Sequence, residues 1–239
     1  MTPPRRSSRG PNRGWIKDTV QIAGIVDELE ARMLVDSGVD LLGIPLGAPV
    51  HNENLTERDV ARIAGDPACR GRVVLITYLD KAGDILLLCR NLEIGIVQLH
   101  GEIKSDEIAR LRSMDPELRI VKSLVIGQSD IASQMEATGG LVDAFITDTF
   151  DEKTGARGAT GMTHDWRKSR AIVQRSLLPV MLAGGLNHRN VARAIREVGP
   201  AGVDVHTGVE DARDRKVPEL VRAFVAQARA AFAARRKTK

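Results

Sequence analysis

The sequence predicts a single (β/α)8 barrel of the TIM type, and three observations support this α/β fold class. Short apolar runs rich in Val, Ile and Leu alternate with longer amphipathic stretches along the chain. The runs are nearly continuous rather than alternating with polar residues, which is typical of parallel strands buried on both faces. Eight strand–helix units fit into 239 residues, a length typical of this barrel.

We expect eight buried strands, each followed by a helix. The predicted strands cover residues 19–25, 40–46, 72–78, 94–100, 118–126, 142–149, 178–184 and 201–207. Thr56 is an N-cap candidate for one helix, Asn187 precedes another over 188–198, and the last amphipathic helix covers 218–232. A doubly wound open sheet is the competing architecture. It commonly carries a Gly-x-Gly-x-x-Gly loop after its first strand, which this sequence lacks.

The two termini differ in composition from the rest of the chain. Residues 1–17 are rich in Pro, Arg, Ser and Gly and carry cations but no acid, and residues 235–239 are also basic. We expect both to be tails, the first disordered, around one domain over 18–234. The net charge of +4 arises in these tails, so the body is acidic. Because the chain has only two Trp, one Tyr and four Phe, we expect no base-stacking surface for nucleic acid.

Composition also restricts the compartment. The sequence contains no apolar stretch long enough for a membrane helix, and its N-terminus lacks the apolar core of a secretory signal. Two cysteines, Cys69 and Cys89, are too few for a disulfide framework, which fits a reducing cytoplasm. We expect a cytoplasmic monomer or homodimer that does not bind a membrane, with neither cysteine acting as a nucleophile.

Glycine-rich loops follow the last two predicted strands, at the end of the barrel where active sites lie. Gly184 and Gly185 follow the seventh strand, and Thr207 and Gly208 follow the eighth. Glycines let a backbone approach a ligand closely, and helix N-termini present unbonded N–H groups. We therefore expect a phosphate site in these two loops, with ordinary tight turns as the alternative.

Polar residues also end other predicted strands. Asp148 ends the sixth strand and is a candidate general acid, a role that needs a pKa raised by burial. The Gly-rich segment 153–161 that follows has the composition of a lid or of a third phosphate loop.

His100 ends the fourth strand and either faces a substrate or binds a neighbouring loop. His51, His100, His206 and Asp148 all lie near strand ends, but no pair has local ligand spacing, so we expect no metal.

Five motifs together resemble the phosphoribosylanthranilate isomerase family, in that family's order and over about residues 18–232. They are QLHG at 98–101, DT at 148–149, GATG at 158–161 with HDW at 164–166, LAGGL at 182–186 with NV at 190–191, and GVDV at 202–205 with GVE at 208–210. The resemblance implies a (β/α)8 barrel of tryptophan biosynthesis. Its members need no cofactor and convert a phosphorylated ribosylamine into an aminodeoxyribulose phosphate by an Amadori rearrangement.

Several family roles carry over to matching positions. Asp148 matches the family's general acid. Residues of the loops after strands six, seven and eight match its phosphate site, although Thr207 stands where a Ser is usual: Gly161, Gly184, Gly185, Thr207 and Gly208. His100 and Asp204 lie within matched motifs and are further candidates for substrate binding.

Two family roles do not carry over. The family's general base is a Cys in a KICG run on strand one, whereas this chain has QIAG at 21–24, which puts Ala23 at the base position. The family's Arg after strand two, which holds the anthranilate carboxylate, is also missing, since residues 41–57 contain neither Arg nor Lys. We regard His51 as the candidate substitute base, because its ordinary pKa of about 6.5 suits proton abstraction.

Three functions remain open on the sequence alone. The first is an aldose–ketose isomerase of this family with another base. The second is an enzyme of the same family that acts on a different phosphorylated sugar or amine adduct. The third is a non-catalytic protein that binds a phosphorylated ligand. In each case a small phosphorylated sugar is the expected partner.

Overall fold

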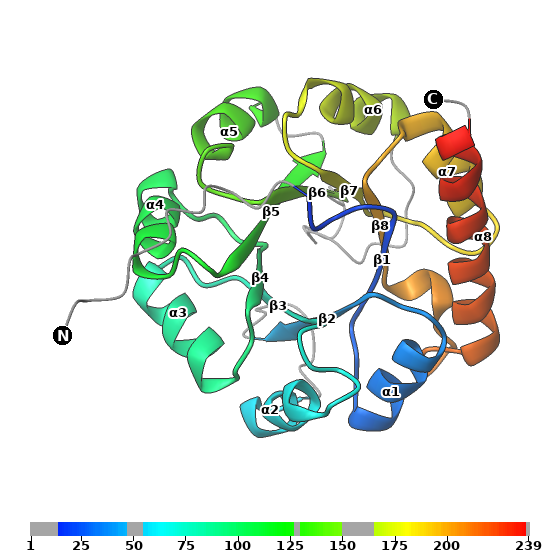
Figure 1. Ribbon diagram of the computed structural model, residues 1–239, viewed down its shortest axis with the longest axis horizontal. Coiled ribbons are helices and arrows are strands. Elements are labelled where there is room, and N and C mark those ends of the chain that lie inside the picture. Colours follow the sequence, from blue (N-terminus) through cyan, green and yellow to red (C-terminus); the bar gives the residue numbers. More distant parts are fainter. Residues whose placement is uncertain (1–13, 47–54, 127–129, 150–164, 238–239) are drawn as a thin grey trace.

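The computed structural model describes residues 14–46, 55–126, 130–149 and 165–237, and these residues form a closed barrel (Figure 1). The strands are all parallel and pair in chain order from β1 to β8, and β8 pairs again with β1. Helices surround the strands in the view down the barrel (Figure 1). The predicted (β/α)8 fold is therefore confirmed.

The elements follow one another as expected. The strands are β1 (Thr19–Ala23), β2 (Leu41–Leu46), β3 (Val73–Thr77), β4 (Ile96–Leu99), β5 (Arg119–Ile126), β6 (Ala144–Thr149), β7 (Val180–Leu182) and β8 (Gly202–Val205). The helices are α1 (Glu28–Asp36), α2 (Glu57–Gly65), α3 (Ala82–Asn91), α4 (Ser105–Met114), α5 (Ile131–Thr138), α6 (Trp166–Arg175), α7 (Val191–Val198) and α8 (Pro218–Lys237), with a short 3₁₀ helix η1 (Thr207–Val209) before α8. Each strand is shorter than predicted, because the apolar runs extend beyond the hydrogen-bonded ladder.

The helix caps confirm one prediction and correct another. Thr56 caps α2: its Oγ1 accepts from the Asp59 N–H at 3.3 Å, and the Asp59 carboxylate accepts from the Thr56 N–H at 3.0 Å. The prediction that Asn187 caps a helix starting at 188 is wrong, since α7 begins after Asn190. Asn187 Oδ1 instead accepts from the Arg189 N–H at 2.9 Å, so a turn precedes the helix.

The apolar core has two layers because side chains of a strand alternate between its faces. Side chains such as Val20, Ile22 and Leu42 are fully buried between the strands and the helices. Smaller groups fill the inside of the barrel. One contains Val121, Ala144, Ile146, Met181 and Ala183, and the other contains Ala23, Leu41, Val74, Ile76 and Ile96.

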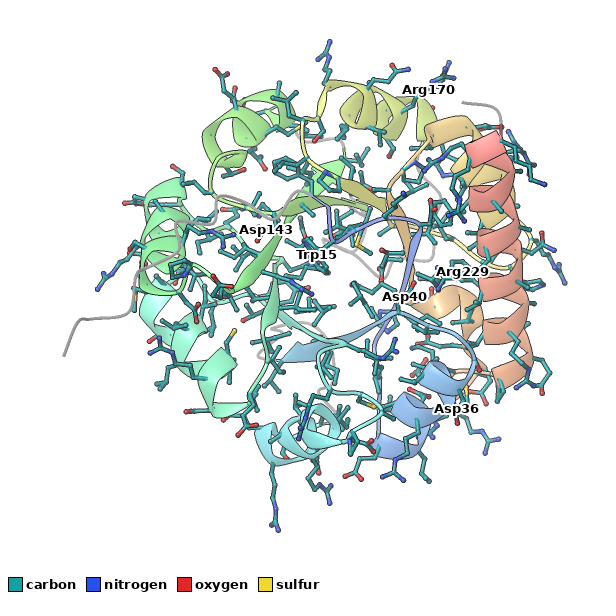
Figure 2. All side chains as sticks on the ribbon, viewed as in Figure 1. Trp15, Asp36, Asp40, Asp143, Arg170 and Arg229 are labelled. Atoms are coloured by element: carbon teal, nitrogen blue, oxygen red, sulfur yellow. The ribbon has the colours of Figure 1, made fainter. Side chains whose placement is uncertain are left out.

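The prediction of a tail through residue 17 is wrong for Trp15 and Ile16. Ile16 is only 3% exposed and packs against the first interior group. Trp15 contacts both groups, and the Arg119 guanidinium lies 5.1 Å from the centroid of its ring. In Figure 2, Trp15 lies at the middle of the barrel. These two side chains therefore close the N-terminal end of the barrel. The sequence did not predict their burial, because the residues around them are basic and rich in proline.

The C-terminal tail also begins later than predicted, because α8 continues to Lys237. Ala and Arg favour helix, and cations stabilise a helix C-terminus. Arg235 donates to the Pro200 carbonyl at 2.6 Å, and Arg229 pairs with Asp40 at 2.7 Å (Figure 2). These contacts hold α8 against the strands. None of the described helices has the length and apolar character needed to cross a membrane.

Ile16→Ala should lower the free energy of unfolding by about 2–4 kcal/mol, because it removes buried apolar surface and leaves a cavity. Leu29→Ala is the control: Leu29 is 74% exposed on α1, and its loss should cost less than about 0.5 kcal/mol. Urea unfolding followed by circular dichroism measures both changes. Equal values for the two variants would show that Ile16 does not close the barrel.

Candidate active site

Three predicted site residues, His100, Asp148 and Asp204, come together inside the C-terminal half of the barrel. His100 directly follows β4, and the two aspartates lie on β6 and β8. The charges of His100 and Asp148 both act on the Asp204 carboxyl, which shows that the three side chains lie close to one another.

His100 and Asp148 form a buried pair. His100 Nε2 lies 3.0 Å from Asp148 Oδ2, and the two side chains are only 10% and 7% exposed. The other ring nitrogen, Nδ1, lies 3.1 Å from Ser123 Oγ on β5, and Tyr78 packs edge-on against the imidazole. The imidazole thus has a polar neighbour at each of its nitrogens. Asp148 and Ser123 lie on strands β6 and β5 rather than on a neighbouring loop, and contact of His100 with a substrate stays a prediction.

Asp204 is a buried residue of strand β8 rather than of the loop that follows it. It is 9% exposed, and its Oδ1 is buried without a hydrogen-bond partner among the described residues. Burial raises the pKa of Asp204 to about 7, a hydrogen bond from Gln21 opposes that shift, and the charge of Asp148 adds to it. Gln21 is itself fixed, since its Nε2 donates to Gln98 Oε1 at 3.1 Å. This carboxyl therefore exchanges a proton near neutral pH.

The loops after β7 and β8 contain glycines that their backbone requires, and they contact each other at Gly208. Gly184 and Gly185 have φ values of 101° and 61°, which favour glycine. A Cβ on Gly208 would stand 1.9 Å from the Leu186 carbonyl oxygen, so only glycine fits between the loops. The Asn190 side chain holds the first loop: its Nδ2 donates to the Gly185 carbonyl at 2.9 Å and its Oδ1 accepts from the Asn187 N–H at 2.8 Å.

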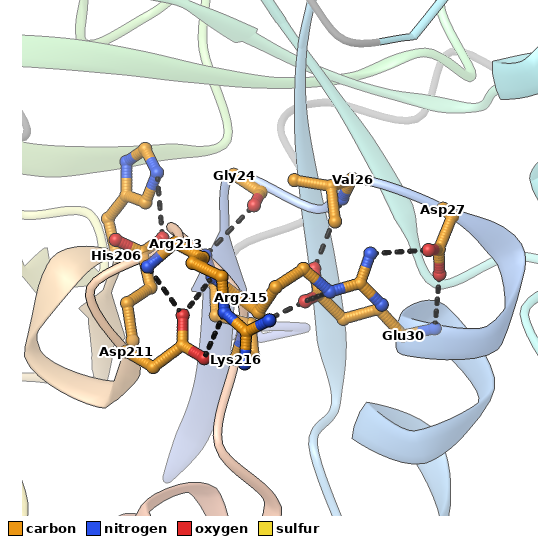
Figure 3. A network of polar contacts seen from close by, with 10 residues as sticks. Gly24, Val26, Asp27, Glu30, His206, Asp211, Arg213, Arg215 and Lys216 are labelled. Atoms are coloured by element: carbon orange, nitrogen blue, oxygen red, sulfur yellow. Dashed lines mark hydrogen bonds and ion pairs between the residues drawn. The ribbon is translucent and has the colours of Figure 1, made fainter.

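A polar network that sequence reasoning left unassigned lies at the end of β1. His206 Nε2 lies 3.3 Å from Glu210 Oε1, and Glu210 forms an ion pair with Lys216 (Figure 3). Lys216 Nζ also donates to the Gly24 carbonyl at 2.9 Å, next to Ala23. The spacing of His206 and Glu210, four residues apart across η1, was the sequence signal for this contact.

Other residues predicted from the sequence are not among the described residues of the site. His51 and Gly161 lie outside the described residues, as does the Gly-rich segment 153–161. Cys69 and Cys89 are buried, and burial raises the pKa of the Cys89 thiol to about 12, so neither is a reactive thiolate. Within the described ranges, no group of three or more His, Cys, Asp or Glu side chains is arranged to hold a metal ion.

Asp204→Asn should stabilise the protein more at pH 8 than at pH 5. Because burial raises the pKa of Asp204 above its unfolded value, stability is lost as pH rises from about 4 to about 7. The amide carries no charge and avoids that loss, so its advantage should be about 2 kcal/mol larger at pH 8. Urea unfolding at both pH values measures it, with Asp36→Asn on exposed α1 as control. An equal effect at both pH values would contradict the raised pKa.

Comparison with known proteins adds a family to this geometry. A family model described as N-(5'phosphoribosyl)anthranilate (PRA) isomerase matches residues 49–227. That range holds β3 to β8 and leaves out β1 and β2, the strands whose ends depart from the family pattern.

Relatives and solved structures agree with the family model. The chain is 34% identical to N-(5'-phosphoribosyl)anthranilate isomerase 2 of Methanosarcina mazei, over 89% of this chain and 95% of the relative. It is 35% identical to the isomerase of Haloferax volcanii, over 89% of this chain and 93% of the relative. The crystal structure of the Thermotoga maritima isomerase superposes with a TM-score of 0.74 at 25% identity, over 89% of this chain and 98% of that one. The chain therefore belongs to the N-(5'-phosphoribosyl)anthranilate isomerase family.

Proposed function

We propose that this protein isomerises N-(5'-phosphoribosyl)anthranilate to the corresponding 1-amino-1-deoxyribulose 5-phosphate in tryptophan biosynthesis. The observation that carries the proposal is the buried His100–Asp148 pair, which lies at the family's acid position in a chain of this family. The rearrangement moves hydrogen within one molecule and needs no external oxidant. We expect the reaction to proceed with no cofactor.

The loops after β7 and β8 would bind the phosphate. Their glycines hold the backbone of the two loops in contact, and the N-termini of η1 and α7 lie in the same loops. Backbone N–H groups at such positions favour an anion. We assign Gly184, Gly185, Thr207 and Gly208 to this site, with Gly161 as a further contact that stays a prediction.

Asp148 would act as the general acid. It gives a proton to the ring oxygen of the ribosylamine while the C1–O bond breaks, and the nitrogen lone pair forms the C1–N double bond. His100, 3.0 Å away, can resupply that proton and stabilise the carboxylate left behind. A base must then take the C2 proton, and Ala23 cannot do so. The assignment of His51 to this role stays a prediction.

An enzyme that acts on a different amine adduct of phosphoribose is the second candidate function. Residues 41–57 contain neither Arg nor Lys, so the segment that holds the anthranilate carboxylate in the family offers no cation here. A carboxylate bound without a cation loses a charge-assisted hydrogen bond. This favours a substrate without a carboxylate on the amine side.

Complementation of a tryptophan auxotroph that lacks the isomerase tests the proposed function directly. Growth without tryptophan supports it. Purified protein should then be assayed with the phosphoribosyl adducts of anthranilate and of aniline, which differ only in the carboxylate. Failure to grow, with turnover of the aniline adduct alone, would favour the second candidate. Binding of ribose 5-phosphate with no turnover of either adduct would indicate the non-catalytic protein.

Asp148→Asn should lower kcat/KM by about 10²–10⁴, because an amide cannot deliver the proton to the ring oxygen. KM should change little, since the phosphate loops are intact. Asp36→Asn, an exposed change on α1, is the matched control and should behave as the wild type. Steady-state fluorescence assays of anthranilate adducts measure both variants. An Asp148→Asn enzyme within threefold of the wild type would remove Asp148 from the reaction.

Gly185→Val should weaken binding of ribose 5-phosphate at least tenfold, because a β-branched residue is strained at a φ of 61° and displaces the loop backbone. The control is Gly83→Val on α3, where an added Cβ meets nothing within 4 Å. Isothermal titration calorimetry measures both affinities, and circular dichroism checks folding. Unchanged affinity in a folded Gly185→Val protein would place the phosphate elsewhere.

A further inference from the structure

We propose that His206, held by Glu210, is the general base that removes the C2 proton, and that it replaces the family's strand-one cysteine. This inference rests on the proposed isomerase function. It moves the base from the end of β1 to the end of β8, the strand that pairs with β1 to close the barrel.

The register between β1 and β8 places His206 beside the vacant base position. Gln21 pairs with Asp204 and Ile22 with Val205, the last residue of β8, so His206 follows the strand beside the end of β1, where Ala23 lies. A Cβ on Gly24 would stand 1.9 Å from His206 Nε2, which shows that the imidazole packs directly against the backbone after Ala23.

The surroundings of His206 suit a base that gains and loses a proton. Its side chain is 26% exposed, whereas Glu210 is 7% exposed and Lys216 fully buried. A carboxylate on one ring nitrogen fixes the orientation of the imidazole and stabilises the imidazolium that forms when His206 takes up a proton.

The network behind His206 fixes Glu210 and ties the loop after β8 to the loop after β1. Lys216 pairs with Glu210 and donates to the Gly24 carbonyl, and its N–H donates to the buried Glu30 carboxylate at 2.8 Å. Glu30 also accepts from the Val26 N–H at 3.1 Å. The side chains are held in place before a substrate arrives, which is what efficient proton transfer requires.

The charged groups facing His206 come from three elements. Glu210 and Lys216 belong to the segment after β8, and Asp204 precedes His206 on β8 itself. From α1 and its N-cap, Glu30 and Asp27 lie further along the same network, where Arg215 pairs with Asp27 at 2.5 Å. Of these groups, Glu210 lies in direct contact with the imidazole, at 3.3 Å from Nε2, and its carboxylate stabilises the imidazolium.

The proton-transfer step balances without a further reactant. After ring opening, the C2–H bond breaks and the proton moves to His206. The electron pair of that bond forms the C1–C2 double bond, and the electrons of the C1–N double bond return to nitrogen. The resulting enolamine becomes the ketose when C1 takes up the proton from His206, which returns to its neutral form, while the C2 hydroxyl gives its proton to the Asp148 carboxylate left by ring opening and becomes the carbonyl.

The test compares His206→Gln with His51→Ala, the variant that removes the base expected from the sequence. His206→Gln should lower kcat by about 10²–10⁴ with KM within threefold of the wild type, and by a larger factor than His51→Ala does, whereas Asp36→Asn, the exposed control on α1, should stay within threefold. Adding Ala23→Cys to His206→Gln should recover at least tenfold of the lost activity, because it returns a base to β1. Calorimetry with ribose 5-phosphate confirms that the site of each variant is intact.

Glu210→Gln supplies a readout that a purely structural role would not change. Loss of the carboxylate destabilises the imidazolium, so the lower limb of the kcat–pH profile should move to lower pH and the maximum should fall. Full activity of His206→Gln, a loss in His51→Ala instead, or an unmoved profile in Glu210→Gln would each overturn the proposal. A wild type that does not turn over the anthranilate adduct would overturn the proposed function and this inference with it.

Discussion

The hydrogen bonds between β8 and β1 close the barrel, and the arrangement of the site depends on that closure. They set Thr19 opposite Gly202 and Gln21 opposite Asp204, which joins the two ends of the folded chain. Gln21 can then donate to the Asp204 carboxyl, and Lys216 can reach the Gly24 carbonyl. Arg229 of α8 adds a bond to the Asp18 carbonyl just before β1, at 2.5 Å. A shift of β8 by one residue relative to β1 would turn the Asp204 side chain to the other face of the sheet.

The barrel interior has a layer of apolar side chains toward its N-terminal end and a layer of polar side chains toward its C-terminal end. The two layers have opposite effects on stability. Apolar side chains such as Met181 and Ile146 lose contact with water and stabilise the fold. Asp204 and Asp148 lie above them, where burial destabilises a charged carboxyl. Such an arrangement is kept where chemistry requires it, because a pKa near neutrality lets a carboxyl hold or release a proton. The same buried carboxyls therefore lower the stability of the fold and supply groups that can take part in proton transfer.

Much of the fold was predictable from the sequence, because buried parallel strands leave apolar runs that local chemistry reveals. The positions of Asp148 and of the glycine-bearing loops after β7 and β8 followed from the same argument, since residues after barrel strands converge at one end, while phosphate binding by these loops stays a prediction. The ends of the chain were harder to predict. Ile16 is a single apolar residue in a basic segment, and its burial depends on strands distant in sequence. The pairing of His206 with the end of β1 likewise depends on the β1–β8 register, which no local pattern specifies.

Trp15 and Ile16 fill the N-terminal end of the barrel, so the carboxyls inside are not reached from that end. Solvent and substrate must then share the same entrance to reach the carboxyls inside. A sugar phosphate lying across that entrance separates Asp148 and Asp204 from bulk water for as long as it stays bound. A hydrogen taken from C2 then has the substrate itself as its nearest acceptor, so the geometry favours its return to C1 over its loss to the solvent.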